Sequence, residues 1–464
     1  MPVDMPESDA CERAARATST PAAGRRRTNL TVLALVFLGF ISLGLPDGLL
    51  GVAFPSIRQT FGVPLDALGA VFLTSVCGYL AASLASGWIV DRIGVALLLA
   101  LSALATAIGL LGYALAPSWW VIVALGLVAG LGAGAIDAGL NSYVALAHTP
   151  RLLAWLHACF GIGAATGPGI MMTVLESGQP WRLGYAVVGV AQLALGVCFL
   201  VTRRQWQVTP EEPLTPRPPI AHHGAPPLRG IPTVPHAGEG EISVPDSPLP
   251  RKGEGEVALT PALSQRERGS VALRLRAEPA VWLSVLLFVV YTGTETAAGQ
   301  WAYTLFVEGR GFSVQAAGVA VSAFWGALAL GRVAAGLIAN NIAPVTLIRS
   351  CMFGMLAGAV IVWANLTPWL SFGGLGLIGL AAAPVFPSLI GVTPARFGAA
   401  QAATLIGFQV AAASLGIAGL PALAGVLAGR VGLEVIPLLL VLSSLLMIGV
   451  HELVVRLSAR LRPA

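Results

Sequence analysis

The amino-acid sequence predicts an all-α integral membrane protein with twelve transmembrane helices in two pseudo-symmetric six-helix bundles. Of its 464 residues, 56% are hydrophobic and 11% are charged, and the mean hydropathy is +0.80. This composition excludes an ordinary soluble protein. Apolar runs of about 20 residues also recur along the chain, each long enough to cross about 30 Å of hydrocarbon. Finally, glycines in the two halves repeat at a constant offset, which indicates an internal duplication.

The apolar runs form two groups of six on either side of a long polar linker. Helices are expected near residues 30–54, 66–90, 95–116, 119–146, 152–175, 181–202, 280–306, 314–339, 344–364, 368–392, 400–428 and 432–456. The corresponding domains are a tail (1–28), a bundle (29–202), a linker (203–277), a second bundle (278–457) and a short tail (458–464).

The polar segments are expected to be disordered. Residues 1–28 are Arg-rich and contain no small-residue cleavage site after an apolar run, which favours a cytoplasmic tail over a signal peptide. The linker 203–277 is rich in Pro, Gly and charge and has too little apolar content to fold alone. It contains HAGEGEI at 236–242 and RKGEGEV at 251–257, a pattern that resembles translated bacterial repeat DNA. A bacterial inner membrane is therefore the expected location.

Basic residues predict the orientation, because short cytoplasmic loops hold more Lys and Arg than external loops. With the N-terminus inside, most basic residues outside the linker also fall inside: Arg25, Arg26, Arg27, Arg92, Arg151, Arg349, Arg396, Arg456, Arg460 and Arg462. Four arginines remain outside: Arg58, Arg182, Arg310 and Arg430. Both termini are therefore expected in the cytoplasm.

The internal duplication rests on glycines that lie 249 positions apart. The pairs are Gly62 and Gly311, Gly69 and Gly318, Gly87 and Gly336, Gly44 and Gly293, Gly130 and Gly379, and Gly167 and Gly416. Chance matches are common in a chain with 55 glycines, but the order of these pairs within equivalent spans favours a duplicated half. Duplicated halves of this kind enclose a site near the middle of the membrane.

The fourth span contains an unusual polar pair within GLGAGAIDAGLNSYV at 130–144. Asp137 and Asn141 are four residues apart and share one helix face. Gly130, Gly132 and Gly134 allow a neighbouring backbone to approach. An ionisable group inside a membrane span is costly, so it indicates a functional site that faces a polar cavity.

The loop after the second span, GWIVDRIG at 87–94, resembles the loop signature of the major facilitator superfamily. The resemblance implies a cytoplasmic gate in which Gly87 allows close helix packing and the Asp91/Arg92 pair helps latch the cytoplasmic side; the alternative is a loop turn with a solvated ion pair. In the second half Gly336 is kept, and Asn340 stands where Asp91 would fall, so that latch has only neutral hydrogen bonds. Arg332 of WGALALGR is assigned to the same gate; the alternatives are a pair with an acid or snorkelling to the interface.

A narrower resemblance, to the fucose-permease-like sugar/proton symporters, covers both halves. It rests on LPDGLLGVAFPSIRQTFG at 45–62, DAGLN at 137–141 and LHACFGIGAATGP at 156–168. In that family, acids on the first and fourth helices line the sugar cavity and take part in proton coupling. The resemblance assigns these roles to Asp47 and Asp137, with Asn141 beside the substrate. A family member has Glu where Asp137 stands, so the carboxyl here reaches one methylene less.

The chemistry of carboxyl groups favours proton coupling independently of the family. Removal from water and a second nearby acid both favour the neutral form, so such a group can take up a proton on one side and release it on the other. Glu295 lies within YTGTETAAGQWAY at 291–303 and is 249 positions after Pro46, the same offset as the glycine pairs. It therefore occupies nearly the same place in the second half as Asp47 does in the first. We expect proton coupling at Asp47, Asp137 and Glu295. The alternative for Asp47 is a solvated carboxylate near the end of its helix.

Several other polar and aromatic residues are candidates for substrate binding, because aromatic faces cover the apolar side of a pyranose and amides bond its hydroxyls. They are Asn141, His157, Gln192, Gln300, Trp301, Trp325 and Gln409. The alternatives are packing or an interfacial belt for the tryptophans and interhelical hydrogen bonding for the others.

Other chemistries are excluded or unsupported. The single lysine, Lys252, lies in the linker, so no phosphate-binding GxxxxGK[ST] loop exists and ATP cannot drive transport. The five cysteines have no metal-binding spacing, and we expect no catalytic residue, metal or cofactor. The net charge of +5 reflects the inside arginines and not nucleic-acid binding. The expected partners are a small solute, protons and the bilayer, with the chain as a monomer.

The leading hypothesis is a proton-coupled secondary transporter that moves a small polar solute, a monosaccharide, by alternating access. A proton antiporter that exports drugs or metabolites is the first alternative, because GAATGPG at 163–169 partly resembles the drug-antiporter signature of the fifth helix. A membrane sensor that keeps the fold without transport is the second.

Overall fold

Twelve helices are long and apolar enough to cross a membrane, as the sequence predicts. The structure is a computed structural model that describes residues 30–147, 150–206, 278–338 and 342–460, and within these ranges it contains no strand. The predicted gate residue Asn340 lies outside the described residues. The N-terminal half (30–206) and the C-terminal half (278–460) belong to one compact unit.

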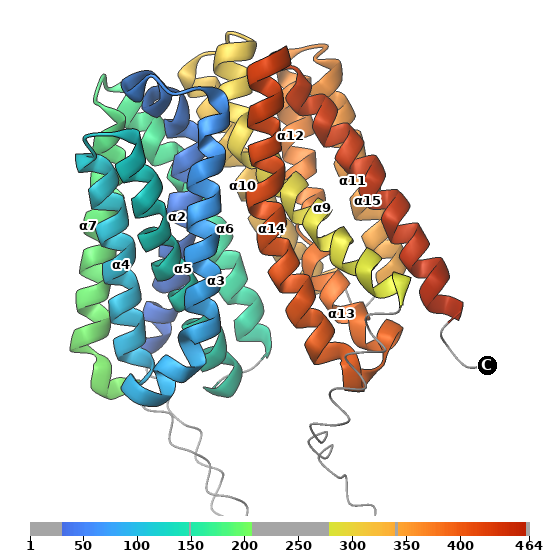
Figure 1. Cartoon of the computed structure of the whole chain (residues 1–464), viewed down its shortest axis with the longest axis horizontal. Coiled ribbons are helices and arrows are strands. Elements are labelled where there is room, and N and C mark those ends of the chain that lie inside the picture. The colour runs from blue at the N-terminus through green and yellow to red at the C-terminus, as the bar shows by residue number, and fades with distance from the viewer. Residues whose placement is uncertain (1–29, 148–149, 207–277, 339–341, 461–464) are drawn as a thin grey trace, which may run out of the picture. The chain divides into compact units, whose positions relative to one another are not determined.

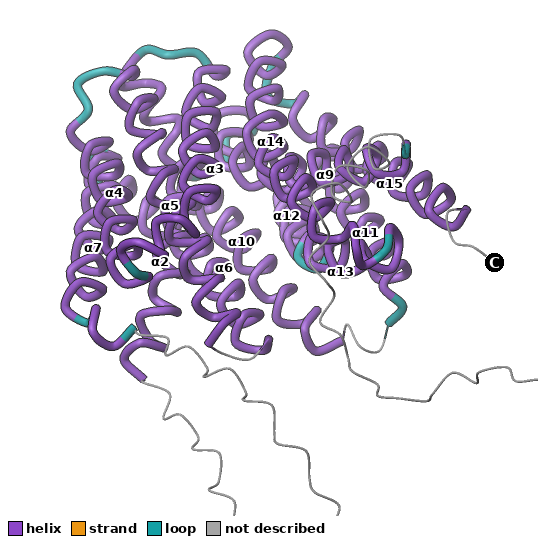
Figure 2. Tube along the Cα trace, turned by 60° about the horizontal axis from the view of Figure 1, so that its bottom comes forward, coloured by secondary structure: helices purple, strands orange, loops and turns teal. Residues whose placement is uncertain are grey.

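Each half contributes six spans (Figures 1 and 2). The N-terminal half contains α2 (Leu30–Phe61), the short η1 (Leu65–Ala67), α3 (Leu68–Ile93), α4 (Val95–Leu115), α5 (Trp119–Ala147), α6 (Pro150–Glu176), α7 (Trp181–Val201) and η2 (Arg203–Gln205). The C-terminal half contains α9 (Pro279–Thr304), the π-helical turn η3 (Leu305–Gly309), α10 (Val314–Ile338), α11 (Pro344–Ala364), α12 (Pro368–Ala382), α13 (Val385–Phe397), α14 (Ala399–Val431) and α15 (Val435–Arg460).

Two spans differ from the expected ranges. The first extends to Phe61 rather than to residue 54, because α2 continues through Pro55. The tenth span is interrupted between Ala382 and Val385, so it consists of α12 and α13. Pro384 has no N–H to donate at this point, which explains the interruption. Two glycines of the duplication, Gly62 and Gly311, adopt matching left-handed conformations, with φ of 63° and 67°.

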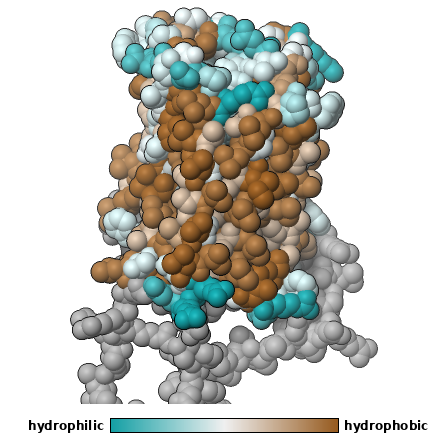
Figure 3. Space-filling view, turned by 90° about the vertical axis from the view of Figure 1, so that its left-hand side faces the viewer, coloured by the Kyte–Doolittle hydropathy of each residue, from teal (hydrophilic) through white to brown (hydrophobic). Residues whose placement is uncertain are grey.

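The outer surface fits a membrane. Figure 3 shows a broad hydrophobic band between hydrophilic patches at the two ends of the unit. Exposed tryptophans occur near both ends: Trp88, Trp155 and Trp282 near the end at which α2 begins, and Trp120, Trp363 and Trp369 near the end at which α2 finishes. Tryptophans prefer the membrane–water interface, so they mark the two borders of the band. We call these the Leu30 end and the Phe61 end.

The two halves meet along α6 and α10 and at the Phe61 end. A Cβ added at Gly161 of α6 would lie 2.4 Å from Cβ of Ala329 in α10, so these helices pack closely. At the Phe61 end, the Arg58 guanidinium contacts the Glu308 carboxylate at 2.6 Å between α2 and η3. Gly69 of α3 also packs against Ala422 of α14. Towards the Leu30 end the axes of α3 and α14 diverge (Figure 1).

Candidate functional site

A cavity of about 490 Å³ lies between the halves, and most of its wall belongs to the N-terminal half. The wall is largely apolar and aromatic, with Phe40, Phe72, Phe160, Trp325 and Phe386 among the ring-bearing residues. Its polar side chains are Asp47, Ser75, Tyr79, Thr106, Tyr113, Asp137, Asn141, His157, Tyr185, Gln192, Glu295, Thr296, Gln300 and Arg332. All three predicted acids therefore line one cavity.

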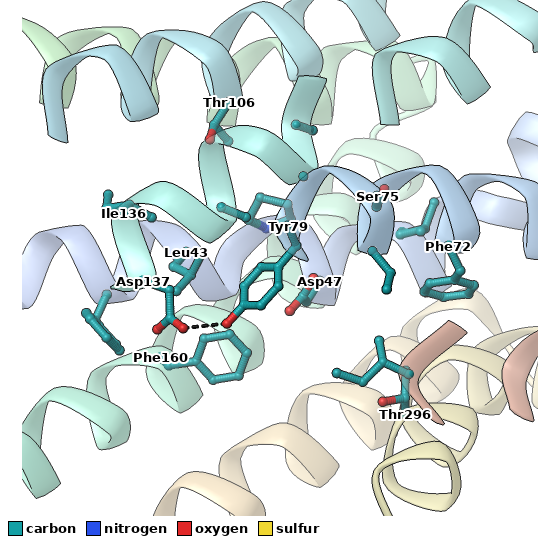
Figure 4. Close-up of a pocket in the computed structure, with 18 of the residues that line it drawn as sticks. Leu43, Asp47, Phe72, Ser75, Tyr79, Thr106, Ile136, Asp137, Phe160 and Thr296 are labelled. Atoms are coloured by element: carbon teal, nitrogen blue, oxygen red, sulfur yellow. Dashed lines mark hydrogen bonds between the residues drawn. The ribbon is translucent and has the colours of Figure 1, made fainter. Parts of the chain in front are cut away.

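The glycines of α5 determine where Asp137 lies. A Cβ at Gly130 would be 2.0 Å from the Ser75 carbonyl oxygen, and a Cβ at Gly134 would be 2.2 Å from that of Tyr79. Residues four apart share a helix face, so both glycines bring α5 against α3. This close approach lets the Tyr79 hydroxyl donate to Asp137 Oδ2 at 2.5 Å (Figure 4).

Asn141 completes the surroundings of Asp137. Its Nδ2 donates to Asp137 Oδ1 at 2.9 Å, so each carboxylate oxygen accepts one hydrogen bond. The predicted pair thus interacts directly on one face of α5. Asn141 lines the cavity and is held in place by the acid.

Asp47 has different surroundings. Gly44 and Gly48 pack α2 against the carbonyl oxygens of Phe160 and Ala164 in α6, while the Asp47 side chain is exposed in the cavity beside Tyr79 (Figure 4). Among the described residues, no hydrogen bond to its carboxyl group is found. Its main-chain oxygen accepts from Gln300 Nε2 at 2.8 Å, a bond that joins the two halves.

Glu295 and Arg332 form a pair on the C-terminal side of the cavity. Arg332 Nη2 lies 3.7 Å from Glu295 Oε1, beyond hydrogen-bond distance, and the guanidinium carbon lies 5.6 Å from the centroid of the Phe160 ring. The Tyr291 hydroxyl contacts both Glu295 and the Ala382 carbonyl oxygen. Arg332 thus lines the cavity and lies near an acid, which agrees with one of the two alternatives for it, and its role in the cytoplasmic gate stays a prediction.

Three buried polar atoms at the cavity have no hydrogen-bond partner among the described residues: Gln192 Oε1, Gln300 Oε1 and the Tyr185 hydroxyl. The amide nitrogens of both glutamines are occupied, since Gln192 Nε2 donates to the Ser42 carbonyl oxygen at 2.8 Å. Buried polar atoms usually bond to protein, water or ligand. These three atoms are therefore buried polar groups beside the cavity whose hydrogen-bonding capacity the described residues leave unused.

Two predicted substrate residues lie away from the cavity wall. Trp301 is completely buried, its Nε1 donates to the Pro421 carbonyl oxygen at 2.9 Å, and its ring packs edge-on against Phe54 across the halves. Gln409 donates to Ser284 at 3.3 Å and accepts from Thr393 at 3.1 Å inside the C-terminal half. Packing and interhelical bonding, the alternatives named above, describe both residues.

Trp325 and His157 do line the cavity. The His157 ring packs edge-on against Phe40, with the ring centroids 5.6 Å apart. Both therefore remain candidates for contact with a solute.

Within the described residues, the Asp91/Arg92 latch of the predicted gate is not formed. Gly87 and Gly336 each face open space, and Asp91 is exposed. The Arg92 guanidinium lies 3.6 Å from the centre of the Trp88 ring. In the described ranges neither Asp91 nor Arg92 forms an ion pair.

Sequence reasoning missed the tyrosines. Tyr79 and Tyr291 each contact a cavity acid, and the buried Tyr185 hydroxyl has no hydrogen-bond partner among the described residues. A usable signal existed for Tyr291, which precedes Glu295 by four residues and so shares its helix face. No such spacing marks Tyr79, whose partner is 58 residues away.

Residues 36–418 match the family described as the Major Facilitator Superfamily. The chain belongs to this superfamily. It is therefore a multi-pass membrane protein of a transporter family, and the resemblance drawn from GWIVDRIG is confirmed.

Several relatives of the chain are named after the solute that they transport. The chain is 27% identical to the 3-(3-hydroxy-phenyl)propionate transporter of Escherichia coli, over 88% of this chain and 89% of that one. It is 25% identical to the human sodium-dependent glucose transporter 1, over 84% of this chain and 72% of that one. The crystal structure of a D-xylose-proton symporter superimposes with a TM-score of 0.63 at 13% identity, covering 90% of this chain and 97% of that one, which supports the fold.

Proposed function

We propose that this chain is a proton-coupled secondary transporter that moves a small polyhydroxylated solute, a monosaccharide or a close derivative, across the bacterial inner membrane by alternating access. Both termini are in the cytoplasm. The observation that carries the proposal is the position of three acids, Asp47, Asp137 and Glu295, on the wall of one cavity between the two halves. A relative named for glucose transport supports a sugar as the solute.

The cavity has the hydrogen-bonding pattern that sugar hydroxyls require. The Asp47 and Asp137 carboxyl groups are acceptors in its wall, and a sugar supplies several O–H donors. Arg332 provides donors on the opposite wall. The aromatic side chains, among them Trp325 and Phe160, can cover the apolar face of a pyranose.

Asp47 is the acid that we assign to proton uptake. Both oxygens of Asp137 already accept a hydrogen bond, and these two bonds stabilise its charged form against protonation. The Asp47 carboxyl group lies exposed in the cavity with no such bond among the described residues, so a proton can reach either oxygen. Asp137 then serves as a fixed acceptor beside the solute.

Glu295 offers a second site for a proton. The Tyr291 hydroxyl has one hydrogen and faces two acceptors, Glu295 and the Ala382 carbonyl oxygen. When Glu295 is neutral, it can donate to the Tyr291 oxygen while Tyr291 donates to Ala382. The loss of the Glu295 charge also removes its attraction for Arg332, which becomes free to bond a solute oxygen.

Alternating access requires the Phe61 end to open. The contacts that would break are the ion pair of Arg58 with Glu308 and the bond from Gln300 to the Asp47 carbonyl oxygen. The close packing of Gly161 on Ala329 between α6 and α10 supplies a seam about which the halves can turn. In this conformation the solute would enter or leave at the Leu30 end, the proposed cytoplasmic side.

Drug export remains the second candidate, because an aromatic cavity with acids also suits an organic cation. The GAATGPG segment adds nothing to that case. A Cβ at Gly163 would lie 1.9 Å from the Ile41 carbonyl oxygen, and one at Gly167 would lie 2.5 Å from that of Leu45. These glycines are explained by the packing of α6 on α2.

Uptake by purified protein in liposomes tests the proposal. A panel of radiolabelled sugars would be offered under a pH gradient, under a sodium gradient and with neither, for the wild type, Asp47→Asn and Asp137→Asn. Asp66→Asn, an exposed aspartate outside the cavity, is the matched control. We expect accumulation driven by the pH gradient that is lost in Asp47→Asn, while exchange of labelled for unlabelled sugar continues.

The alternatives give different results. Accumulation that persists in both cavity variants refutes the proton assignment. Accumulation driven only by a sodium gradient means that sodium, and not the proton, is the coupling ion. Expulsion of a lipophilic cation without sugar uptake supports export. Sugar binding without any flux supports a sensor.

A further inference from the structure

Arg332 is a charged side chain of the cavity whose hydrogen-bond donors are unused. Of the described residues that line the cavity, Arg332 alone is a lysine or an arginine. Its side chain is 20% exposed, and within the described ranges no atom accepts a hydrogen bond from its guanidinium, since Glu295 Oε1 lies at 3.7 Å. The buried atoms that lack a partner in the described part of the chain include Gln192 Oε1 but no nitrogen of Arg332. The guanidinium is therefore reachable from the cavity.

The N-terminal half contributes the wall beside this guanidinium. The centroid of the Phe160 ring in α6 lies 5.6 Å from the guanidinium carbon, within the range of a cation–π contact. His157 lies one turn earlier on α6, is exposed in the cavity and interacts electrostatically with Arg332. We call Arg332, Phe160, His157 and Glu295 the Arg332 corner. It lies where α6 of one half packs on α10 of the other, so a ligand held there contacts both halves.

A neutral sugar leaves the charge of the Arg332 corner unbalanced. A sugar hydroxyl accepts from one N–H group, whereas a guanidinium has five N–H groups and a permanent positive charge. Glu295 balances that charge only while it is ionised, and in the proposed cycle it takes up a proton. A charge in the membrane interior without a counter-charge is costly. A carboxylate on the solute supplies the counter-charge, and its two oxygens match two parallel N–H groups of the guanidinium.

The acids of the cavity determine when such a solute can bind. With Asp47, Asp137 and Glu295 all ionised, the acids outnumber Arg332 and the cavity repels an anion. Protonation of Asp47 and Glu295 leaves Asp137 to balance Arg332, and protonation of His157 adds a positive charge. The repulsion then falls, so protons and an anionic solute assist each other's binding. This mutual assistance is the coupling that a symporter requires.

We infer that the solute carries a carboxylate group, which the Arg332 corner binds. The inference rests on the proposed function and narrows its substrate class from monosaccharides to sugar acids, such as hexuronates. The carboxylate lies against Arg332, and the ring hydroxyls bond to Asp47 and Asp137 in the N-terminal half. A solute held in this way joins the two halves through its charge beside the contact of α6 with α10.

The test compares sugars that differ in charge. Purified full-length protein would be titrated with glucuronate, with its uncharged amide glucuronamide, with glucose and with the cationic glucosamine, by thermal stabilisation and by competition with sugar exchange in liposomes. The galactose series would be tested in parallel. The amide has nearly the shape of the acid without its charge. We expect glucuronate to bind at least about tenfold more tightly than glucuronamide, because hydrogen bonds between two charged groups are about twice as strong as neutral ones.

Variants of the Arg332 corner separate charge from shape. Arg332→Gln removes the charge and keeps two N–H donors, so the preference for glucuronate over glucuronamide should fall to about one. Arg332→Lys keeps the charge without the planar fork and should retain part of the preference. Glu295→Gln removes the competing carboxylate and should tighten the binding of glucuronate more than that of glucuronamide. Arg430→Gln is the control, because this exposed arginine lies in the last turn of α14 and outside the cavity wall.

The outcomes distinguish this inference from the proposed function. If sugars are transported but glucuronate binds no more tightly than glucuronamide, or if Arg332→Gln leaves their ratio unchanged, the carboxylate class is wrong and the transport proposal stands. Tighter binding of glucosamine than of glucose and glucuronate refutes the inference in favour of a cationic solute. If no sugar, neutral or charged, binds or moves, the proposed function fails.

Discussion

Replacement of Gly130 by alanine would test whether the close approach of α5 and α3 builds the site. The added Cβ would lie 2.0 Å from the Ser75 carbonyl oxygen and 2.8 Å from its carbonyl carbon, whereas ordinary contacts begin near 3.4 Å. Both atoms belong to the backbone and cannot rotate away. The helices must therefore separate by on the order of 1 Å, and overpacking of this kind costs about 1–3 kcal/mol.

The separation should also be visible at the acid. The Tyr79 hydroxyl donates to Asp137 at 2.5 Å across this helix pair, so a shift of about 1 Å carries the contact to the limit of a hydrogen bond. We expect a lower melting temperature together with weaker uptake driven by a pH gradient. Both are measured on the same purified protein, in detergent and in liposomes.

Gly449→Ala of α15 is the matched control, because a Cβ there meets nothing within 4 Å. Alanine is the better helix former by up to about 1 kcal/mol, so this variant should be as stable as the wild type or more so. Unchanged stability and uptake in Gly130→Ala would refute the argument that close backbone approach positions Asp137.

Three further predictions concern contacts of single side chains. Tyr79→Phe removes one hydrogen-bond donor to Asp137, and a hydrogen bond to a charged group contributes about 1.5–3 kcal/mol. The variant should therefore alter the pH profile of uptake driven by a pH gradient. An unchanged profile would show that Tyr79 has no part in proton coupling. Glu308→Gln weakens the partly exposed pair with Arg58, worth about 0–1 kcal/mol, and should raise the reactivity of a cysteine introduced at the Phe61 end; equal labelling would contradict a closing role. Trp301→Phe removes a buried hydrogen bond and should destabilise the protein by about 0.5–1.5 kcal/mol without altering the ranking of solutes; a changed ranking would return Trp301 to the binding site.

The fold was largely predictable because a bilayer permits few ways to satisfy the backbone. Uninterrupted apolar length marks a spanning helix, and ten of the spans follow directly from it. The break at Pro384 was not predicted, since membrane helices tolerate proline, and α2 continues through both Pro46 and Pro55.

The site was only partly predictable. Asp47, Asp137 and Glu295 stand out because charge is rare within apolar runs, and Asn141 is tied to its acid by local helix spacing. Trp301 and Trp325 look alike in the sequence, yet one is sealed between the halves and the other lines the cavity. Tyr79 depends on the register of α3 against α5, which only tertiary packing specifies.

The hydrogen bond from Gln300 has a consequence for how this molecule can be altered. The side-chain amide of Gln300 donates to the main-chain oxygen of Asp47 and not to its carboxyl group. Every amino acid has that main-chain oxygen. A substitution of the Asp47 side chain therefore keeps the atom that accepts this bond. The proposed proton site and this contact between the halves thus use different atoms of one residue, so Asp47→Asn can test the first without removing the acceptor of the second.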